Sequence, residues 1–216
     1  MNKLEVKCVT KKIKDDIIIN NANLSFEAGK THILVGENGS GKTMLLRYIA
    51  GLMKSDEGEL LYNDIPYAFG GERNFTVGLL LENVGLYNEF TLFDNLEMLS
   101  LVNKKASKQE IVSAIKRVGL DPYSKKTFGK FSLGMKKRAV IAQAILEKPD
   151  ILLLDEPTNG LDKDGKKLFF DILEEEKQRG AIIIVSSHIS EDIQGMADEI
   201  IQVENGCYSK LEKGII

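Results

Sequence analysis

The fold of this chain is decided by one stretch, Gly36-Glu37-Asn38-Gly39-Ser40-Gly41-Lys42-Thr43. It matches the pattern G-x-x-x-x-G-K-[ST], in which a glycine-rich loop cradles phosphate groups. Residues 31–35 before it, Thr-His-Ile-Leu-Val, predict a short buried strand, and residues 43–50 after it predict a helix. This order of strand, loop and helix is the context that the motif requires. The predicted nucleotide site comprises Gly36, Asn38, Gly39, Ser40, Gly41, Lys42 and Thr43.

The residue types of this loop suit a nucleoside triphosphate. Glycines allow the backbone to pass close to the phosphates, and amide groups at the N-terminus of a helix point at an anion. Lys42 is expected to reach the β and γ phosphates, and the hydroxyl of Thr43 is expected to hold Mg²⁺.

Size and composition are those of an ordinary globular protein. The chain has 216 residues, 43% of them hydrophobic, and a net charge of −3. This length suits one α/β domain with an inserted subdomain, and the charge balance predicts no nucleic-acid partner. We expect no signal peptide at the N-terminus, no apolar run long enough to span a bilayer, and unpaired thiols at Cys8 and Cys207.

Short strands are predicted around the P-loop. Residues 4–10 alternate apolar and polar side chains, and residues 17–19 and 24–26 indicate two further strands. Residues 58–62 form a strand pattern that enters a turn at Asn63-Asp64. Together these segments predict a small antiparallel sheet beside the P-loop core.

From about residue 85 to residue 131 the pattern becomes helical. One candidate helix carries Phe93, Leu96, Leu99 and Leu101. The next carries Ile111, Ile115 and Val118 and ends at Gly119. Parallel-strand patterns return at 151–154 and 181–185, so this helical block is interpreted as an insertion in a parallel α/β core.

Residues 151–156, Ile-Leu-Leu-Leu-Asp-Glu, form an apolar strand that ends in two acids. A continuous apolar run is typical of a buried parallel strand, and active groups of open α/β sheets gather at the carboxyl ends of the strands. Asp155 can hold Mg²⁺ there, as a Walker B acid does. Glu156 can orient the attacking water or accept its proton.

A helix is predicted to begin near Ser132, just before this strand. Ser132 is a suitable N-cap, and Ala139, Ala142 and Ile145 follow at helical spacing. The segment is open to two interpretations, a capped helix or a second phosphate site made of a hydroxyl, a glycine amide and a helix N-terminus. The basic run 136–138 is expected to form a solvated face.

Taken in order, these motifs resemble the ATP-binding cassette (ABC) ATPase family over essentially the whole chain. Residues 36–43 match Walker A, residues 131–135 match the family signature, and residues 154–158 match Walker B. Residues 159–162 match the D-loop, and His188 matches the switch histidine.

The resemblance implies a fold and a division of the chain. The expected fold class is α/β, a P-loop NTPase (RecA-like) parallel core with an N-terminal antiparallel β subdomain and an inserted α-helical subdomain. The chain is expected to form a single ABC ATPase domain over 1–216. The core and β subdomain would occupy about 1–84 and 136–216, and the helical subdomain about 85–135.

The resemblance also implies a mechanism in which two cassettes pair head to tail, as a homodimer or a heterodimer. Each ATP would lie between Walker A of one cassette and Ser132 and Gly134 of the other. Glu156 would polarise water, His188 would contact the γ-phosphate, and Asp162 would communicate across the dimer. In transporters, separate permease subunits receive the resulting motion at the cytoplasmic face of the membrane.

This sequence departs from the family pattern at three places. The usual glutamine of the Q-loop aligns with Glu82, whose carboxylate could also ligate Mg²⁺. In the signature, Leu133 replaces a glycine and Met135 replaces a glutamine. The aromatic residue that stacks on adenine aligns with Ile13, which offers only aliphatic contact. The Glu82 and signature changes resemble the bacitracin- and lantibiotic-type exporter branch.

The preferred interpretation is the ATP-hydrolysing subunit of an ABC transporter, an exporter, with membrane subunits on other polypeptides. The alternative is an ABC ATPase that drives a macromolecular assembly; a nucleotide-gated binding module without turnover is a further one. Permease docking is predicted at residues 82–93, which carry a cluster of apolar and aromatic side chains: Leu86, Tyr87, Phe90, Leu92 and Phe93.

Overall fold

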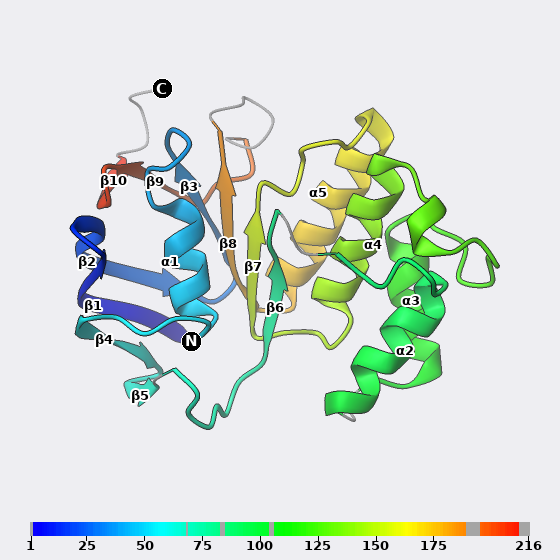
Figure 1. The fold of residues 1–216 in the computed structure, drawn as a ribbon, viewed down its shortest axis with the longest axis horizontal. Helices are drawn as coiled ribbons and strands as arrows, with labels where there is room; N and C mark the ends of the chain where they lie inside the picture. Colours follow the sequence, from blue (N-terminus) through cyan, green and yellow to red (C-terminus); the bar gives the residue numbers. More distant parts are fainter. Residues whose placement is uncertain (1, 68, 83–84, 104–105, 189–194, 212–216) are drawn as a thin grey trace.

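The computed structural model describes residues 2–67, 69–82, 85–103, 106–188 and 195–211. Two β-sheets and several helices make up these residues (Figure 1). The larger sheet stands in the middle of the molecule, with the small antiparallel sheet on one side and helices α2 to α4 on the other.

The larger sheet has six strands in the order β10-β9-β3-β8-β7-β6. All neighbouring pairs are parallel except β9 and β10. Its strands are β3 (Lys30–Val35), β6 (Val77–Leu80), β7 (Ile151–Asp155), β8 (Ile182–Ser187), β9 (Glu199–Glu204) and β10 (Cys207–Leu211). Every residue of β7 and β8 is buried, as expected for parallel strands that are covered on both faces.

The smaller sheet has four antiparallel strands in the order β2-β1-β4-β5. These are β1 (Lys3–Ile13), β2 (Asp16–Glu27), β4 (Glu57–Tyr62) and β5 (Ile65–Tyr67). The prediction of two separate strands at 17–19 and 24–26 was wrong, because both lie in β2. The polar stretch between them stays in the sheet through a bulge, where Asn21 has a φ of 44° and the amide of Cys8 donates to the side chain of Asn23.

The helices cover both faces of the larger sheet. They are α1 (Lys42–Ile49), α2 (Leu92–Asn103), α3 (Lys108–Arg117), α4 (Leu133–Ile145) and α5 (Lys163–Gln178), with a short 3₁₀ turn at Phe128–Lys130. Helix α1 lies between the two sheets, where Leu45 and Leu46 are fully buried. Helices α2 to α5 cover the opposite face (Figure 1). Alternate residues of β7 therefore belong to different cores, with Leu153 on the α1 side and Leu152 on the other.

The predicted fold class, a parallel P-loop core with an antiparallel β part and a helical insertion, is confirmed. The boundaries of the helical subdomain near residues 85 and 135 stay a prediction. Sequence reasoning missed β6, α5, β9 and β10. The β9–β10 hairpin did carry a signal, since Asn205-Gly206 is a dipeptide typical of two-residue hairpin turns. Both residues have positive φ, 48° and 76°.

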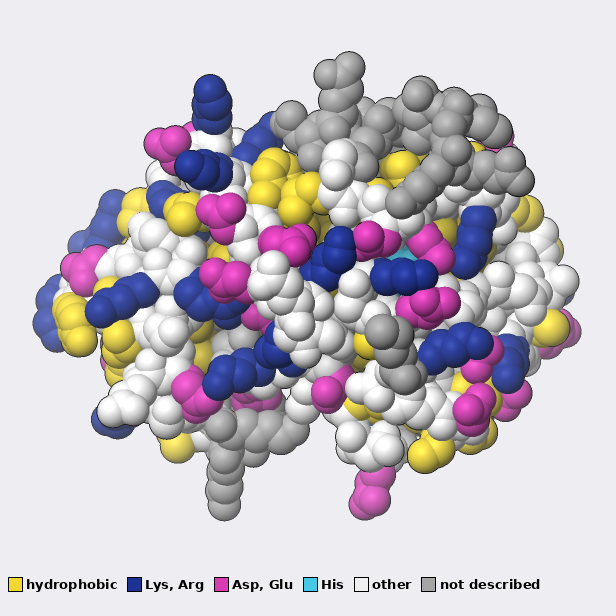
Figure 2. Space-filling view, turned by 180° about the vertical axis from the view of Figure 1, so that it is seen from behind, with side chains coloured by type: hydrophobic (Ala, Val, Ile, Leu, Met, Phe, Trp, Pro, Cys, Tyr) yellow, Lys and Arg dark blue, Asp and Glu magenta, His cyan; other side chains and the backbone are white. Residues whose placement is uncertain are grey.

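The surface carries charges of both signs. Figure 2 shows Lys and Arg side chains interspersed with Asp and Glu over the face seen from behind. Among the residues that the structure describes, no helix is long and apolar enough to cross a membrane.

Candidate nucleotide site

The P-loop connects β3 to α1 and contacts neighbouring backbone on its outer side. Gly41 has a φ of 114° and Gly39 a φ of 82°, values that L side chains rarely adopt. A Cβ atom on Gly36 would lie 2.1 Å from the carbonyl oxygen of Val203, and one on Gly41 would lie 2.9 Å from that of Ile18. Close packing therefore requires glycine at both 36 and 41, and the backbone angle also favours it at 41.

Lys42 is 5% exposed and folds back over its own loop. Its Nζ donates to the carbonyl oxygens of Gly36 at 2.7 Å and Glu37 at 2.9 Å. Asn38 and Gly39 at the tip of the loop are exposed. The loop thus surrounds a cationic side chain and opens to solvent at its tip, which suits an anionic ligand.

Thr43 and Asp155 meet at the end of β7. The Thr43 hydroxyl lies 3.0 and 2.9 Å from the two carboxylate oxygens of Asp155, and the Ser186 hydroxyl donates to Asp155 Oδ1 at 2.5 Å. Asp155 is 2% exposed. Two of the three predicted Mg²⁺ ligands are therefore brought together, and β8 supplies a second hydroxyl that sequence reasoning did not identify.

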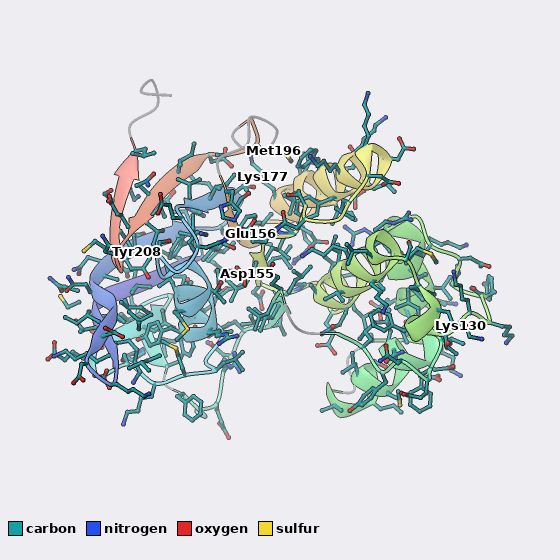
Figure 3. The ribbon with its side chains drawn as sticks, turned by 45° about the horizontal axis from the view of Figure 1, so that its top comes forward. Lys130, Asp155, Glu156, Lys177, Met196 and Tyr208 are labelled. Carbon is teal, nitrogen blue, oxygen red and sulfur yellow. The ribbon has the colours of Figure 1, made fainter. Side chains whose placement is uncertain are left out.

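Glu156 is held in a constrained conformation. Its φ is 46°, rare for a residue with a Cβ, and its amide donates to the carbonyl oxygen of Ser186 at 3.1 Å. The side chain is buried, and Oε1 has no hydrogen-bond partner among the described residues. Backbone outliers of this kind gather at functional sites. Figure 3 shows Asp155 and Glu156 in the middle of the molecule, between the β strands and helices α2 to α4.

The pKa of Glu156 is raised above the ordinary value of a glutamate. Burial is the main cause, and the charge of Asp155 adds to it, whereas His188 and Lys42 act in the opposite direction. A buried carboxylate that is costly to ionise is well suited to accept a proton from water.

His188 follows directly after β8 and lies half exposed beside Glu156. Its Nε2 is 3.5 Å from Glu156 Oε1, and its side chain is 49% exposed. The structure therefore brings the two predicted catalytic residues together, with the histidine on the solvent side of the carboxylate.

Glu82 lines a pocket of about 340 Å³ between the core and the helices. Lys137 lines the same pocket, and the carboxylates of Glu82, Asp155 and Glu156 face its ammonium group. Burial lowers the pKa of Lys137 despite these three charges.

The basic run 136–138 is half-buried, so the prediction of a solvated face was wrong. The first turns of α4 pack toward the helical part of the chain. The Lys136 ammonium lies 5.5 Å from the ring centroid of Phe128, and Arg138 donates to the carbonyl oxygen of Gly119. No local pattern in the sequence indicates this packing.

The signature residues lie at the start of α4. Ser132 is its N-cap and accepts from the amide of Met135 at 3.3 Å. Leu133 is 73% exposed, yet its side chain covers Gly160, where a Cβ atom would lie 3.0 Å from Leu133 Cδ2. A Cβ atom on Gly134 would lie 3.2 Å from the carbonyl oxygen of Gly160. The signature thus packs against the loop that follows Walker B.

Asp162 and Ile13 complete the predicted set. Asp162 is the N-cap of α5, and its Oδ1 accepts from the amide of Gly165 at 2.8 Å. Ile13 is the last residue of β1, pairs with Asp16 at the hairpin end, and is 44% exposed.

The residues of the site fit a triphosphate with Mg²⁺. Ser40 Oγ in the P-loop and Glu156 Oε1 are buried without a hydrogen-bond partner among the described residues. No cluster of three or more acidic, histidine or cysteine side chains suitable for a metal occurs in that part of the chain. Mg²⁺ is commonly held by one or two protein groups together with phosphates and water, and Thr43 and Asp155 are two suitable groups in contact.

Fold and site together define a P-loop NTPase whose Walker A and Walker B elements follow β3 and β7, two parallel strands with β8 between them. The family model described as "ABC transporter" matches residues 19–159. The ABC transporter ATP-binding protein YybJ of Bacillus subtilis is 45% identical over 98% of this chain and 97% of its own length. The chain therefore belongs to the ATP-binding proteins of ABC transporters, and it is an ATPase cassette.

Two further relatives specify the branch. The lantibiotic transport ATP-binding protein SrtF of Streptococcus pyogenes is 32% identical over 91% of this chain and 85% of its own length. The bacitracin transport ATP-binding protein BcrA of Enterococcus faecalis is 33% identical over 94% of this chain and 67% of its own length. The predicted resemblance to the bacitracin and lantibiotic branch is confirmed, and nothing favours the alternative of an ATPase for macromolecular assembly.

Two solved structures share the fold. The dimeric ABC transporter cassette MJ0796 superimposes with a TM-score of 0.86 at 23% identity, over 97% of this chain and 99% of its own. Its post-hydrolysis dimer, bound to ADP and Pi, gives a TM-score of 0.84 at 22% identity over the same shares of both chains.

Proposed function

We propose that this chain hydrolyses ATP with Mg²⁺, with Glu156 as general base and His188 as the group that stabilises charge at the γ-phosphate. The observation that carries the proposal is the state of Glu156. Its carboxyl group is buried and has a raised pKa. Its Oε1 has no hydrogen-bond partner among the described residues and lies 3.5 Å from His188 Nε2. A side chain in this state is available to accept a proton from a water molecule.

Thr43 and Asp155 are the proposed Mg²⁺ ligands, and their direct contact supports the assignment. Mg²⁺ supplies charge stabilisation between the β and γ phosphates when it is bound. Glu82 is proposed as a third ligand, in competition with its attraction to Lys137. Gly36, Gly41 and Lys42 would hold the phosphates, and Ile13 would contact the base from the end of β1.

Two cassettes are proposed to pair head to tail. Ser132 and Gly134 would then bind the ATP of the opposite subunit, and Asp162 would lie between the subunits. The exposed positions of Ser132 and Leu133 support this proposal, as does the dimeric state of the MJ0796 cassette.

Permease subunits are proposed to dock at the pocket beside Glu82, which would place the chain at the cytoplasmic face of the membrane. Gly85, Leu86 and Phe128 line this pocket. Tyr87 and Phe90 stand beside it as a T-shaped pair, 64% and 42% exposed. Exposed aromatic side chains next to an apolar groove favour an amphipathic helix as the bound partner. Asn83 and Val84, near the start of the predicted docking segment, lie outside the described residues.

Loss of the base tests the catalytic proposal. Glu156→Gln keeps the shape of the side chain and removes its ability to accept a proton. We expect the turnover of Mg²⁺-ATP to fall by at least about 10²-fold, the range that general-base catalysis usually supplies, while ATP still binds. Phosphate release under saturating ATP is the measurement. Near-normal turnover would remove Glu156 from this role.

A further inference from the structure

The C-terminal hairpin, residues 199–211, touches the P-loop at three successive points. The carbonyl oxygen of Val203 lies against Gly36. The amide of Gly206 donates to the carbonyl oxygen of Ser40 at 2.9 Å. The hydroxyl of Tyr208 donates to the carbonyl oxygen of Gly41 at 3.2 Å. Figure 3 labels Tyr208 on β10, on the side of the molecule that holds α1 and the small sheet.

The turn of this hairpin is held in place by β2. The amide of Asn20 donates to the carbonyl oxygen of Gly206 at 2.9 Å. Gly206 has a φ of 76°, and a Cβ atom there would lie 2.8 Å from the carbonyl oxygen of Ile18. The turn is therefore fixed between β2 and the P-loop, and its hydrogen bonds act from a rigid support.

These two hydrogen bonds determine the direction of two amide groups. In a trans peptide the C=O group and the following N–H group point in opposite directions, and no peptide bond described here is cis. When Gly206 holds the Ser40 carbonyl outward, the Gly41 amide points into the loop. When Tyr208 holds the Gly41 carbonyl, which also accepts from Leu45, the Lys42 amide is oriented in the same way.

Inward amides at a helix N-terminus are the groups that bind phosphate. We propose that the C-terminal hairpin is a positioning element of the nucleotide site, in which Gly206 and Tyr208 pre-orient the Gly41 and Lys42 amides for the phosphates of ATP. The inference rests on the proposed binding of phosphate by the P-loop. Tyr208 remains a hydrogen-bond donor at physiological pH, since burial raises the pKa of its hydroxyl well above the ordinary value.

Tyr208→Phe tests the proposal, because it removes the hydroxyl and keeps the ring. Calorimetric titration with ATP and with inorganic tripolyphosphate should show both affinities lowered by about threefold to tenfold, the range for one net hydrogen bond. KM for ATP should rise by the same factor with kcat within about twofold. The control is Tyr123→Phe, whose side chain is 70% exposed on a distant loop.

The possible outcomes distinguish failure of the proposed phosphate site from failure of the positioning role of Tyr208. A wild-type protein that binds neither ATP nor tripolyphosphate would contradict the proposed site itself. If the wild type binds both and Tyr208→Phe binds them equally well, the positioning role is overturned. A lower melting temperature with unchanged affinity would assign Tyr208 to stability alone. Weaker binding of both ligands with an unchanged Tyr123→Phe control supports the positioning role.

Discussion

At the scale of one residue, Glu156 lowers the stability of the folded protein at neutral pH, because its carboxyl group is buried. Its buried carboxyl has a raised pKa, and its Oε1 has no hydrogen-bond partner among the described residues. For a group whose folded pKa exceeds its unfolded value, the protonated form stabilises the fold. That stabilisation is fully present below the unfolded value of about 4.5 and is lost as the pH rises through the raised folded value.

Glu156→Gln should therefore stabilise the nucleotide-free protein at neutral pH. The glutamine side chain carries no charge, so the variant avoids the cost of ionising a buried carboxyl, and the melting temperature should rise by roughly 2–4 °C. The difference should shrink as the pH approaches about 4.5, the unfolded value. Thermal unfolding at several pH values, without nucleotide, is the measurement, with exposed Glu89→Gln as control. Equal melting temperatures of variant and wild type at neutral pH would contradict the prediction.

At the scale of secondary-structure elements, the start of α4 packs against the loop that follows β7. Leu133 covers Gly160, whose lack of a side chain leaves room for it. In Leu133→Ala this cover is lost while the helix start keeps a good helix former. We expect amide hydrogen exchange in residues 157–162 to become about threefold to tenfold faster, because a small apolar contact contributes near 1 kcal/mol.

The matched control for this element is Leu101→Ala. Leu101 is 67% exposed on α2, far along the chain from the loop, so exchange in residues 157–162 should stay at the wild-type rate. If both variants leave the exchange of that segment unchanged, Leu133 does not hold the loop.

At the scale of the whole molecule, the proposed head-to-tail dimer predicts that lesions complement each other. In a mixture of Lys42→Ala and Ser132→Ala subunits, one composite site carries both lesions and the other is intact. With equal mixing and independent sites, ATPase activity should recover to about a quarter of the wild-type value. Each variant alone is the control. A mixture no more active than its better parent would argue against shared sites in a homodimer.

Docking of a permease is also a property of the whole molecule. A charge at an exposed aromatic anchor should weaken an apolar interface, so Tyr87→Asp should reduce recovery with the membrane fraction of its host by about tenfold or more. The melting temperature should stay close to that of the wild type, since Tyr87 is 64% exposed. Tyr123→Asp, 70% exposed, is the matched control. Full membrane recovery of folded Tyr87→Asp would exclude Tyr87 from the docking surface.

The sequence by itself determined the P-loop, the Walker B acids and the parallel core, because each depends on residue types at short spacing. Gly36 to Thr43 needs its own glycines and lysine, and β7 needs an unbroken apolar run. Ser132 was identified as a cap for the same reason, since capping uses residues three positions apart.

Only the tertiary structure decided which distant residues share the site. Ser186 and Tyr208 carry no local signal, and the strand order places them. Because β3 lies between β9 and β8 in the sheet, the P-loop that follows it meets the C-terminal hairpin on one side. The position of β8 beside β7 brings Ser186 to Asp155. Long-range pairing of this kind depends on the packing of whole elements, which short-range patterns in a single sequence do not encode.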